Sequence, residues 1–106
     1  MALVDFNKKV WQALKKIPRG KVAAYAQIAK AAKSPNSARA AGNACGKNPF
    51  APIVPCHRVV ASNGSLGGYS GGISKKIKLL AKEGITVKNN KIVNFREKLV
   101  KQKELE

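Results

Sequence analysis

Three side chains in this sequence could perform chemistry together: the adjacent Cys56 and His57, and an isolated acid, Glu83. A thiolate is a strong nucleophile, and a neutral imidazole oriented by a carboxylate accepts protons near neutral pH. A cysteine beside a histidine is a weak indication by itself, because an unpaired cysteine is more often an inert, small apolar side chain. From the pair alone, a reactive thiol and a merely buried one both stay open.

The histidine restricts what kind of catalyst this could be. His57 is the single histidine of the chain, so a papain-like thiol hydrolase would lack its separate base. The run 53–60 is apolar and bounded by turn residues, which predicts a buried strand segment with the thiol in its middle. Because neighbouring side chains of a strand point to opposite faces, we expect His57 to help Cys56 only through a bent backbone or a bridging water.

The glutamate stands alone in a basic chain. Between Asp5 and Glu97, the only acidic residue is Glu83. It could be a surface partner of the adjacent Lys82, which would contribute little to stability. It could equally be a carboxylate held inside the protein to pair with an internal cation or imidazole.

Composition limits the partners. The chain has 106 residues, enough for one domain, and 21 Lys and Arg against five Asp and Glu give a net charge of +16. A surface with this charge favours binding to a polyanion, such as nucleic acid or an anionic membrane. No apolar run could span a bilayer and no signal-peptide pattern begins the chain, so we expect nucleic acid as the partner and no membrane. Cys45 and Cys56 fit no zinc spacing, so we predict free thiols and no metal site.

The elements that must position these residues start with a helix. Apolar residues at helical spacing from Phe6 to Ile17, behind Asp5 as a potential N-cap, predict a first helix that ends at 18–20. An extended piece over 21–24 should follow.

Two short helices come next. We predict one over 25–32, with Ile28 and Ala29 facing inward, and another over 37–47 that is nearly bare of side chains apart from Arg39. Two short helices around a tight turn suggest a helix-turn-helix.

The second half is rich in turns. Five of the nine residues in 64–72 are glycine, which predicts a flexible loop near the thiol. Ser74 should cap a helix that ends before Gly84, with an inward face made of Ile77, Leu80 and Ala81. The run 85–93 reads as a hairpin. The expected fold is therefore mainly α with short β elements, a single winged helix-turn-helix-like domain over 1–95 followed by a charged, solvated or frayed tail over 96–106.

A family resemblance adds to these observations. The octapeptide Ile53–Val60 resembles the active-site signature of the O6-alkylguanine-DNA alkyltransferases, and it is highly specific. Further matching segments follow in the family's order: 22–29 (VAAYAQIA), 38–40 (ARA), 48–49 (NP), 67–72 (GGYSGG) and 79–84 (LLAKEG). The resemblance runs from about Phe6 to Phe95 and implies the family's C-terminal DNA-binding domain, without the N-terminal domain of many members and without any metal site there.

The resemblance also implies roles at the reactive centre. Cys56 would be the alkyl acceptor, His57 the base that acts through a water, and Glu83 the carboxylate that orients His57. Tyr25 would donate toward the guanine ring and press on the phosphate of the rotating nucleotide; otherwise it is an ordinary aromatic side chain at the core edge. Asn48 resembles the asparagine that braces the turn below the active-site segment.

A second set of roles concerns DNA. Arg39 would enter the base stack and fill the gap left by the extruded base, for which a planar cation is suited; otherwise it would contact a phosphate. The small residues Ala38, Ala40 and Gly42 would let their helix enter the narrow minor groove.

The remaining implied roles concern the flipped base. Tyr69 would pack against it, and Ser70 would donate a hydrogen bond near O6. The main-chain carbonyls around Cys56 and Val59 would accept from the guanine amino group, and Lys76 would stand near the pocket rim.

Taken together, the sequence predicts DNA repair by a single transfer of an alkyl group from O6-alkylguanine in double-stranded DNA to Cys56, with base flipping. We expect no cofactor, a monomer, and a place in the cytoplasm with the nucleoid or in a eukaryotic nucleus. One alternative is a non-enzymatic alkyltransferase-like damage sensor, although such proteins typically carry tryptophan in place of the cysteine. Another is a plain helix-turn-helix module, which would leave Cys56, His57 and Glu83 unexplained.

Two residues depart from the family pattern. Ala26 stands where many relatives have glycine, and Cys45 stands where a larger apolar residue is common.

Overall fold

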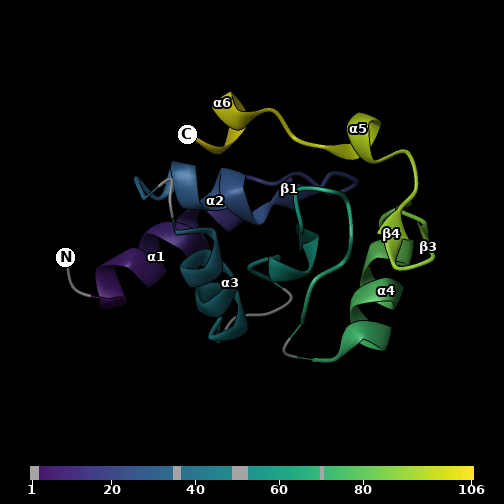
Figure 1. Ribbon diagram of the computed structural model, residues 1–106, viewed down its shortest axis with the longest axis horizontal. Coiled ribbons are helices and arrows are strands. Elements are labelled where there is room, and N and C mark those ends of the chain that lie inside the picture. Colours follow the sequence, from purple (N-terminus) through teal and green to yellow (C-terminus); the bar gives the residue numbers. More distant parts are fainter. Residues whose placement is uncertain (1–2, 35–36, 49–52, 70) are drawn as a thin grey trace.

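The amino-terminal half of the protein is a group of three packed helices. The structure is a computed structural model that describes residues 3–34, 37–48, 53–69 and 71–106. It has α1 (Leu3–Leu14), α2 (Tyr25–Ala31) and α3 (Ala38–Gly46), with α3 lying against both other helices (Figure 1). α1 begins before Asp5, so this residue lies inside the helix and is not its N-cap.

The predicted pair of short helices is confirmed. Ile28 and Ala29 are fully buried on the inner face of α2, and Ala41 and Ala44 are buried on that of α3. Alanine side chains let the helix backbones approach closely, and the indole nitrogen of Trp11 donates to the Ala44 carbonyl at 2.9 Å, which ties α1 to α3.

The segment that carries Cys56 differs from the predicted strand. Residues Cys56–Arg58 form a 3₁₀ turn, η1, and only Val59–Val60 form a strand, β2, which pairs in parallel with β1 (Ala23–Ala24). Proline has no backbone N–H to offer a ladder, and the Pro55 carbonyl instead accepts from the Arg58 amide at 3.0 Å, which closes the turn. The backbone at the thiol is therefore bent.

The second half contains one helix and a hairpin. α4 (Ile73–Lys82) is followed by Gly84, whose φ of +81° is typical of a residue just beyond a helix end. The predicted hairpin is confirmed as β3 (Val87–Lys88) and β4 (Lys91–Ile92), which pair antiparallel. Its two turn residues are asparagines with positive φ, the conformation that a two-residue hairpin turn requires.

The buried face of α4 is not the predicted one. Leu80 is buried as expected, but Ile77 is 37% exposed and Ala81 is also exposed, while Lys76 is completely buried. The helix is rotated so that Lys76 and Leu80, one turn apart, face inward together.

The carboxyl-terminal segment packs on the domain and is not a solvated tail. After α5 (Phe95–Lys98), the Val22 amide donates to the Lys98 carbonyl at 2.9 Å, and the Val100 amide donates to Val22 at 2.8 Å. The last helix, α6 (Gln102–Leu105), lies beside α2, where it buries Leu105 (Figure 1).

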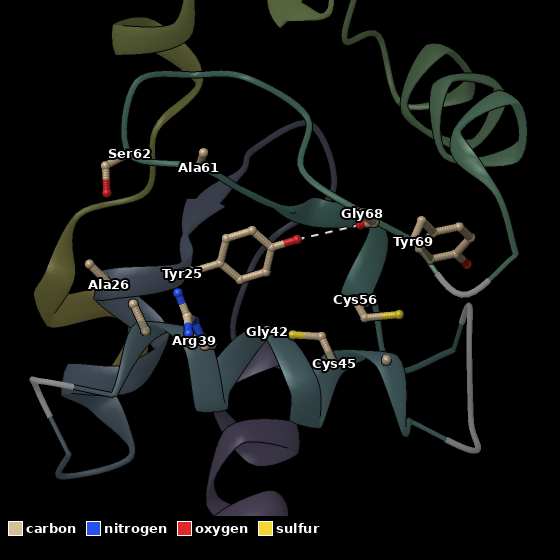
Figure 2. Close-up of a pocket in the computed structure, with 12 residues that line it drawn as sticks. Tyr25, Ala26, Arg39, Gly42, Cys45, Cys56, Ala61, Ser62, Gly68 and Tyr69 are labelled. Atoms are coloured by element: carbon tan, nitrogen blue, oxygen red, sulfur yellow. Dashed lines mark hydrogen bonds between the residues drawn. The ribbon is translucent and has the colours of Figure 1, made fainter.

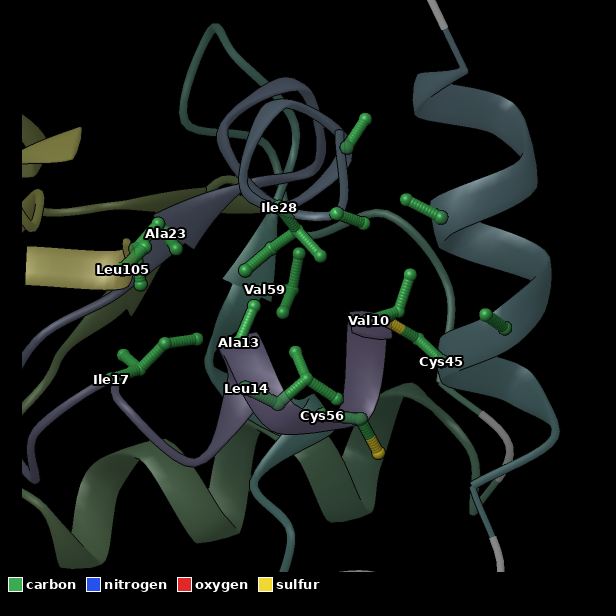
Figure 3. Packing of buried hydrophobic residues seen from close by; sticks show 14 of the residues in the cluster. Val10, Ala13, Leu14, Ile17, Ala23, Ile28, Cys45, Cys56, Val59 and Leu105 are labelled. Carbon is green, nitrogen blue, oxygen red and sulfur yellow. The ribbon is translucent and has the colours of Figure 1, made fainter. Parts of the chain in front are cut away.

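Two clusters of buried side chains hold these elements together. The larger one joins α1, α2 and α3, and it includes both Cys45 and Cys56 among aliphatic neighbours (Figure 3). The smaller one lies between β2, α4 and the hairpin. The fold is thus mainly helical with short strands, and none of the described helices is long and apolar enough to cross a membrane.

The packing of the last helix makes a stability prediction. Leu105 is 1% exposed, so Leu105→Ala should lower the free energy of unfolding by about 2–4 kcal/mol, as is usual for a buried leucine. Urea unfolding monitored by Trp11 fluorescence measures it. The exposed Lys103→Ala is the matched control, with a change within about 0.5 kcal/mol. Equal stabilities of Leu105→Ala and wild type would mean that this segment adds nothing to the core.

Candidate active site

A pocket opens between the helix-turn-helix and the loop that follows β2. Its volume is about 600 Å³, a size suited to a small ligand, and Figure 2 shows its walls. α2 and α3 form one wall, and η1 with the loop forms the other. The lining consists of Tyr25, Ala26, Ala38, Arg39, Gly42, Cys45, Gly46, Cys56, Ala61, Ser62, Gly68 and Tyr69.

Cys56 reaches the pocket from the first position of η1. The residue is only 3% exposed, and its amide donates to the Val54 carbonyl at 2.9 Å. The buried Asn48 side chain donates to the same carbonyl at 2.7 Å. Asn48 therefore lies where it braces the turn that carries the thiol.

Behind the thiol lies a cluster of three charged or titratable groups. His57 Nε2 lies 3.0 Å from Glu83 Oε2. Arg58 donates through Nε to Glu83 Oε1 and through Nη2 to Glu83 Oε2, both at 2.8 Å. Of the two interpretations of Glu83, the internal carboxylate is correct.

The role of Arg58 was not predicted from the sequence. Its third contact, Nη1 to the Ile17 carbonyl at 2.7 Å, reaches the turn after α1. The only available signal was a cation placed directly after His57 inside an apolar run, and a surface arginine would look the same.

Burial and hydrogen bonds set the protonation states of this cluster. Burial lowers the pKa of His57, and the opposing effect of Glu83 is smaller. Burial alone would raise the pKa of Glu83, but hydrogen bonds from Arg58 and His57 outweigh it and lower that pKa. At neutral pH the cluster is therefore a neutral imidazole, a carboxylate and a guanidinium.

These states fix which histidine nitrogen is basic. A carboxylate only accepts hydrogen bonds, so Nε2 of His57 carries the proton and donates a hydrogen bond to Glu83. The lone pair of the neutral ring is then on Nδ1, which is buried and has no hydrogen-bond partner among the described residues. His57 can accept a proton at Nδ1 without leaving Glu83.

Tyr25 spans the pocket from α2 to the loop. Its hydroxyl donates to the Gly68 carbonyl at 3.4 Å (Figure 2), and burial raises its pKa to about 12, so it remains a donor. A Cβ added at Gly67, where φ is +68°, would lie 3.0 Å from the Tyr25 hydroxyl. The loop can approach the ring this closely because glycine occupies that position.

α3 presents little relief to the solvent. Arg39 is exposed, and Ala38, Ala40 and Gly42 beside it are half-buried. Arg39 is thus the one charged residue of α3, and it lies among small side chains at the mouth of the pocket.

Cys45 lines the same pocket as Cys56. Burial, and next the neighbouring Cys56, raise the pKa of Cys45 to about 12. Since a thiolate is the nucleophilic form, we expect the protonated Cys45 not to react at neutral pH.

The other expected site residues differ in where they lie. Tyr69 lines the pocket, whereas Ala40 and Val59 do not. Lys76, expected at the rim, is instead buried beneath the loop. Ser70 lies outside the described residues. No three His, Cys, Asp or Glu side chains gather as a potential metal site within the described part of the chain.

Comparison with known proteins places this geometry in a family. Residues 5–85 match the family described as 6-O-methylguanine DNA methyltransferase, DNA binding domain. The chain belongs to this family. A relative from Salmonella typhimurium, methylated-DNA–protein-cysteine methyltransferase, is 51% identical over 79 residues, which cover 74% of this chain and 46% of that protein.

Solved structures of family members agree. Mycobacterium tuberculosis OGT in complex with DNA is 50% identical with a TM-score of 0.74, covering 76% of this chain and 49% of that one. S. pombe Atl1 in complex with damaged DNA containing O6-carboxymethylguanine is 30% identical with a TM-score of 0.81, covering 95% and 99%. The chain spans about half the length of its methyltransferase relatives and nearly all of Atl1.

The charge cluster predicts the titration of His57. As the single histidine, it gives one imidazole signal in an NMR titration, and its pKa should lie below 6.5. Glu83→Gln should lower that pKa further, because the anion that favours the imidazolium is lost. The exposed Glu104→Gln is the control and should change nothing. An unchanged or raised pKa in Glu83→Gln would contradict the pairing.

Proposed function

We propose that this protein repairs DNA by transferring an alkyl group from O6 of a guanine to Cys56. The observation that carries the proposal is a nearly buried cysteine that opens into a pocket of suitable size, with a proton acceptor held behind it. The family also supports the proposal. The relative from Salmonella typhimurium, of which this chain covers 46%, is a methylated-DNA–protein-cysteine methyltransferase.

The mechanism begins with the proton of the thiol. His57 accepts it at Nδ1, directly or through a water, while Glu83 keeps the ring oriented and stabilises its positive charge. Arg58 donates a hydrogen bond to each oxygen of this carboxylate and so keeps it anionic. The general base is therefore prepared before substrate arrives.

Transfer is then a displacement at carbon. The Cys56 sulfur forms a bond to the alkyl carbon as the bond from that carbon to O6 breaks, and the electron pair goes to guanine. A proton returns to guanine, toward which Tyr25 can donate. The products are an S-alkylcysteine and unmodified guanine. Because a thioether is not readily hydrolysed, each molecule acts once. We propose that it acts as a monomer and without a cofactor.

Access to the base requires flipping it out of the duplex. The net charge of +16 attracts the phosphates, and the low relief of α3 suits a minor groove. Arg39, exposed at the pocket mouth, would occupy the space that the base leaves. Tyr69 and Ser70 would complete the base site, with the carbonyl of Val59 as an acceptor.

The second candidate is a damage sensor without transfer. Its support is the match to Atl1, which covers 95% of this chain and 99% of that protein. Cys56 and its base favour transfer, and the first experiment below separates the two.

Intact-mass analysis tests transfer. After exposure to an oligonucleotide with O6-methylguanine, one methyl group should appear, on the peptide that contains Cys56. Cys56→Ala should take up none and still bind DNA. Cys45→Ala should be methylated like wild type, because the thiol that it removes stays protonated in wild type and takes no part in transfer. A protein that binds the lesion but gains no mass would be a sensor, and label on Cys45 would overturn the assignment.

Arg39→Ala tests base flipping. If Arg39 fills the gap in the stack, its loss should slow single-turnover transfer from duplex DNA by about tenfold or more, and should leave reaction with free O6-benzylguanine nearly unchanged. The exposed Lys47→Ala controls for losing one positive charge. Equal losses on both substrates would remove the flipping role.

A further inference from the structure

Lys76 is a completely buried lysine in the middle of α4. Lysine is almost never fully buried unless its charge is matched by partners. No carboxylate forms an ion pair with it among the described residues. Something else must satisfy the ammonium group.

Three main-chain carbonyls do so. The Nζ atom donates to Val59 at 2.7 Å, to Gly68 at 3.1 Å, and to Leu66. An ammonium group has three N–H donors, so these three acceptors use all of them. The Tyr25 ring covers the same cation, with its centroid 5.9 Å from Nζ.

The acceptors connect two parts of the candidate site. Val59 directly follows the turn that carries Cys56 and His57, whereas Leu66 and Gly68 belong to the loop, the other part of the same pocket wall. Gly68 lines the pocket and also accepts from the Tyr25 hydroxyl. The ammonium group therefore holds the loop wall, the strand after the thiol and Tyr25 in one arrangement.

We propose that Lys76 is a positioning residue for alkyl transfer: its three-way hydrogen bonding sets the shape of the pocket wall without touching DNA or base. This inference rests on the proposed function. It replaces the expected place of Lys76 at the rim.

The arrangement has a consequence for pH. Burial lowers the pKa of Lys76 to about 8, against smaller opposing effects of Cys45 and Cys56. The neutral amine has two N–H donors, so one of the three carbonyls loses its partner above that pH. The carbonyl of Gly68, with the longer contact, is the one we expect to be released.

The titratable groups that face Lys76 come from three elements. Tyr25 on α2 and Cys45 on α3 each have a pKa of about 12, so both stay neutral through this range. On η1, Cys56 is the reacting thiol, and the pKa of His57 is below 6.5. A change centred near pH 8 in the order of the loop therefore belongs to Lys76 if it persists in Cys56→Ala, which removes the other titratable group that faces the ammonium.

Hydrogen exchange of the loop tests the proposal without requiring transfer. In wild type, exchange of amides 64–69, corrected for intrinsic rates, should increase about tenfold through a step near pH 8. In Lys76→Met, a chain of similar length without donors, it should be fast at all pH values and show no step. Lys78→Met, which removes an exposed charge from the same helix, should behave as wild type.

Transfer kinetics provide the second measurement. Single-turnover methyl transfer by Lys76→Met should be about ten- to a hundredfold slower, since small displacements of a positioning wall have effects of this size. Wild type should lose rate above pH 8, and Lys76→Met should not. No step in wild-type loop exchange, or equal exchange in wild type and Lys76→Met, would overturn the role of Lys76. A wild type that transfers nothing while the loop step is present would overturn the proposed function alone.

Discussion

The hydrogen bonds that the Glu83 carboxylate accepts are the interactions on which the turn with Cys56 depends. The carboxylate accepts from His57 and twice from Arg58, neighbours in the turn that begins with Cys56. Arg58 in turn reaches the end of the α1 region through the Ile17 carbonyl. Without the carboxylate, a buried imidazole and a largely buried guanidinium would lose their shared partner, which is costly inside a protein. One anion thus connects α1, the thiol turn and the end of α4.

Both the anion Glu83, at the C-cap of α4, and a cation within α4 bind this segment. Lys76 and Glu83 are seven residues apart, two helical turns, so they project from the same side of the helix axis with Leu80 between them. Glu83 binds the side chains of η1, and Lys76 binds the carbonyl at the start of β2. The polar residues on the inward side of α4 therefore hold the turn between them by hydrogen bonds.

The sequence predicted those features that local patterns determine. Helical spacing, a glycine beyond α4 and two asparagines in a turn are short-range signals, and α1 to α4 and the hairpin were predicted from them. The predicted N-caps Asp5 and Ser74 were wrong, because both residues lie inside their helices. The η1 turn, the burial of Lys76 and the packing of Leu105 depend on partners distant in sequence. Hydropathy predicts that a lysine is exposed, because it takes no account of carbonyls elsewhere in the fold that can accept hydrogen bonds from the buried ammonium group. The role of Arg58 was hidden for the same reason, since its acceptors lie 25 and 41 positions away.

The small side chains of α3 matter on two sides of the helix. On the inner side, Ala41 and Ala44 allow the close approach to α1 and α2 that buries the first core cluster. On the pocket side, a Cβ at Gly42 would be in ordinary van der Waals contact with the Tyr25 ring at 3.7 Å, so this position has room for an alanine but borders the ring directly. A helix that packed with large residues would push Tyr25 outward and separate it from Gly68 and Lys76. The small residues are therefore a condition of the pocket as well as of the core, whatever approaches the helix from solvent.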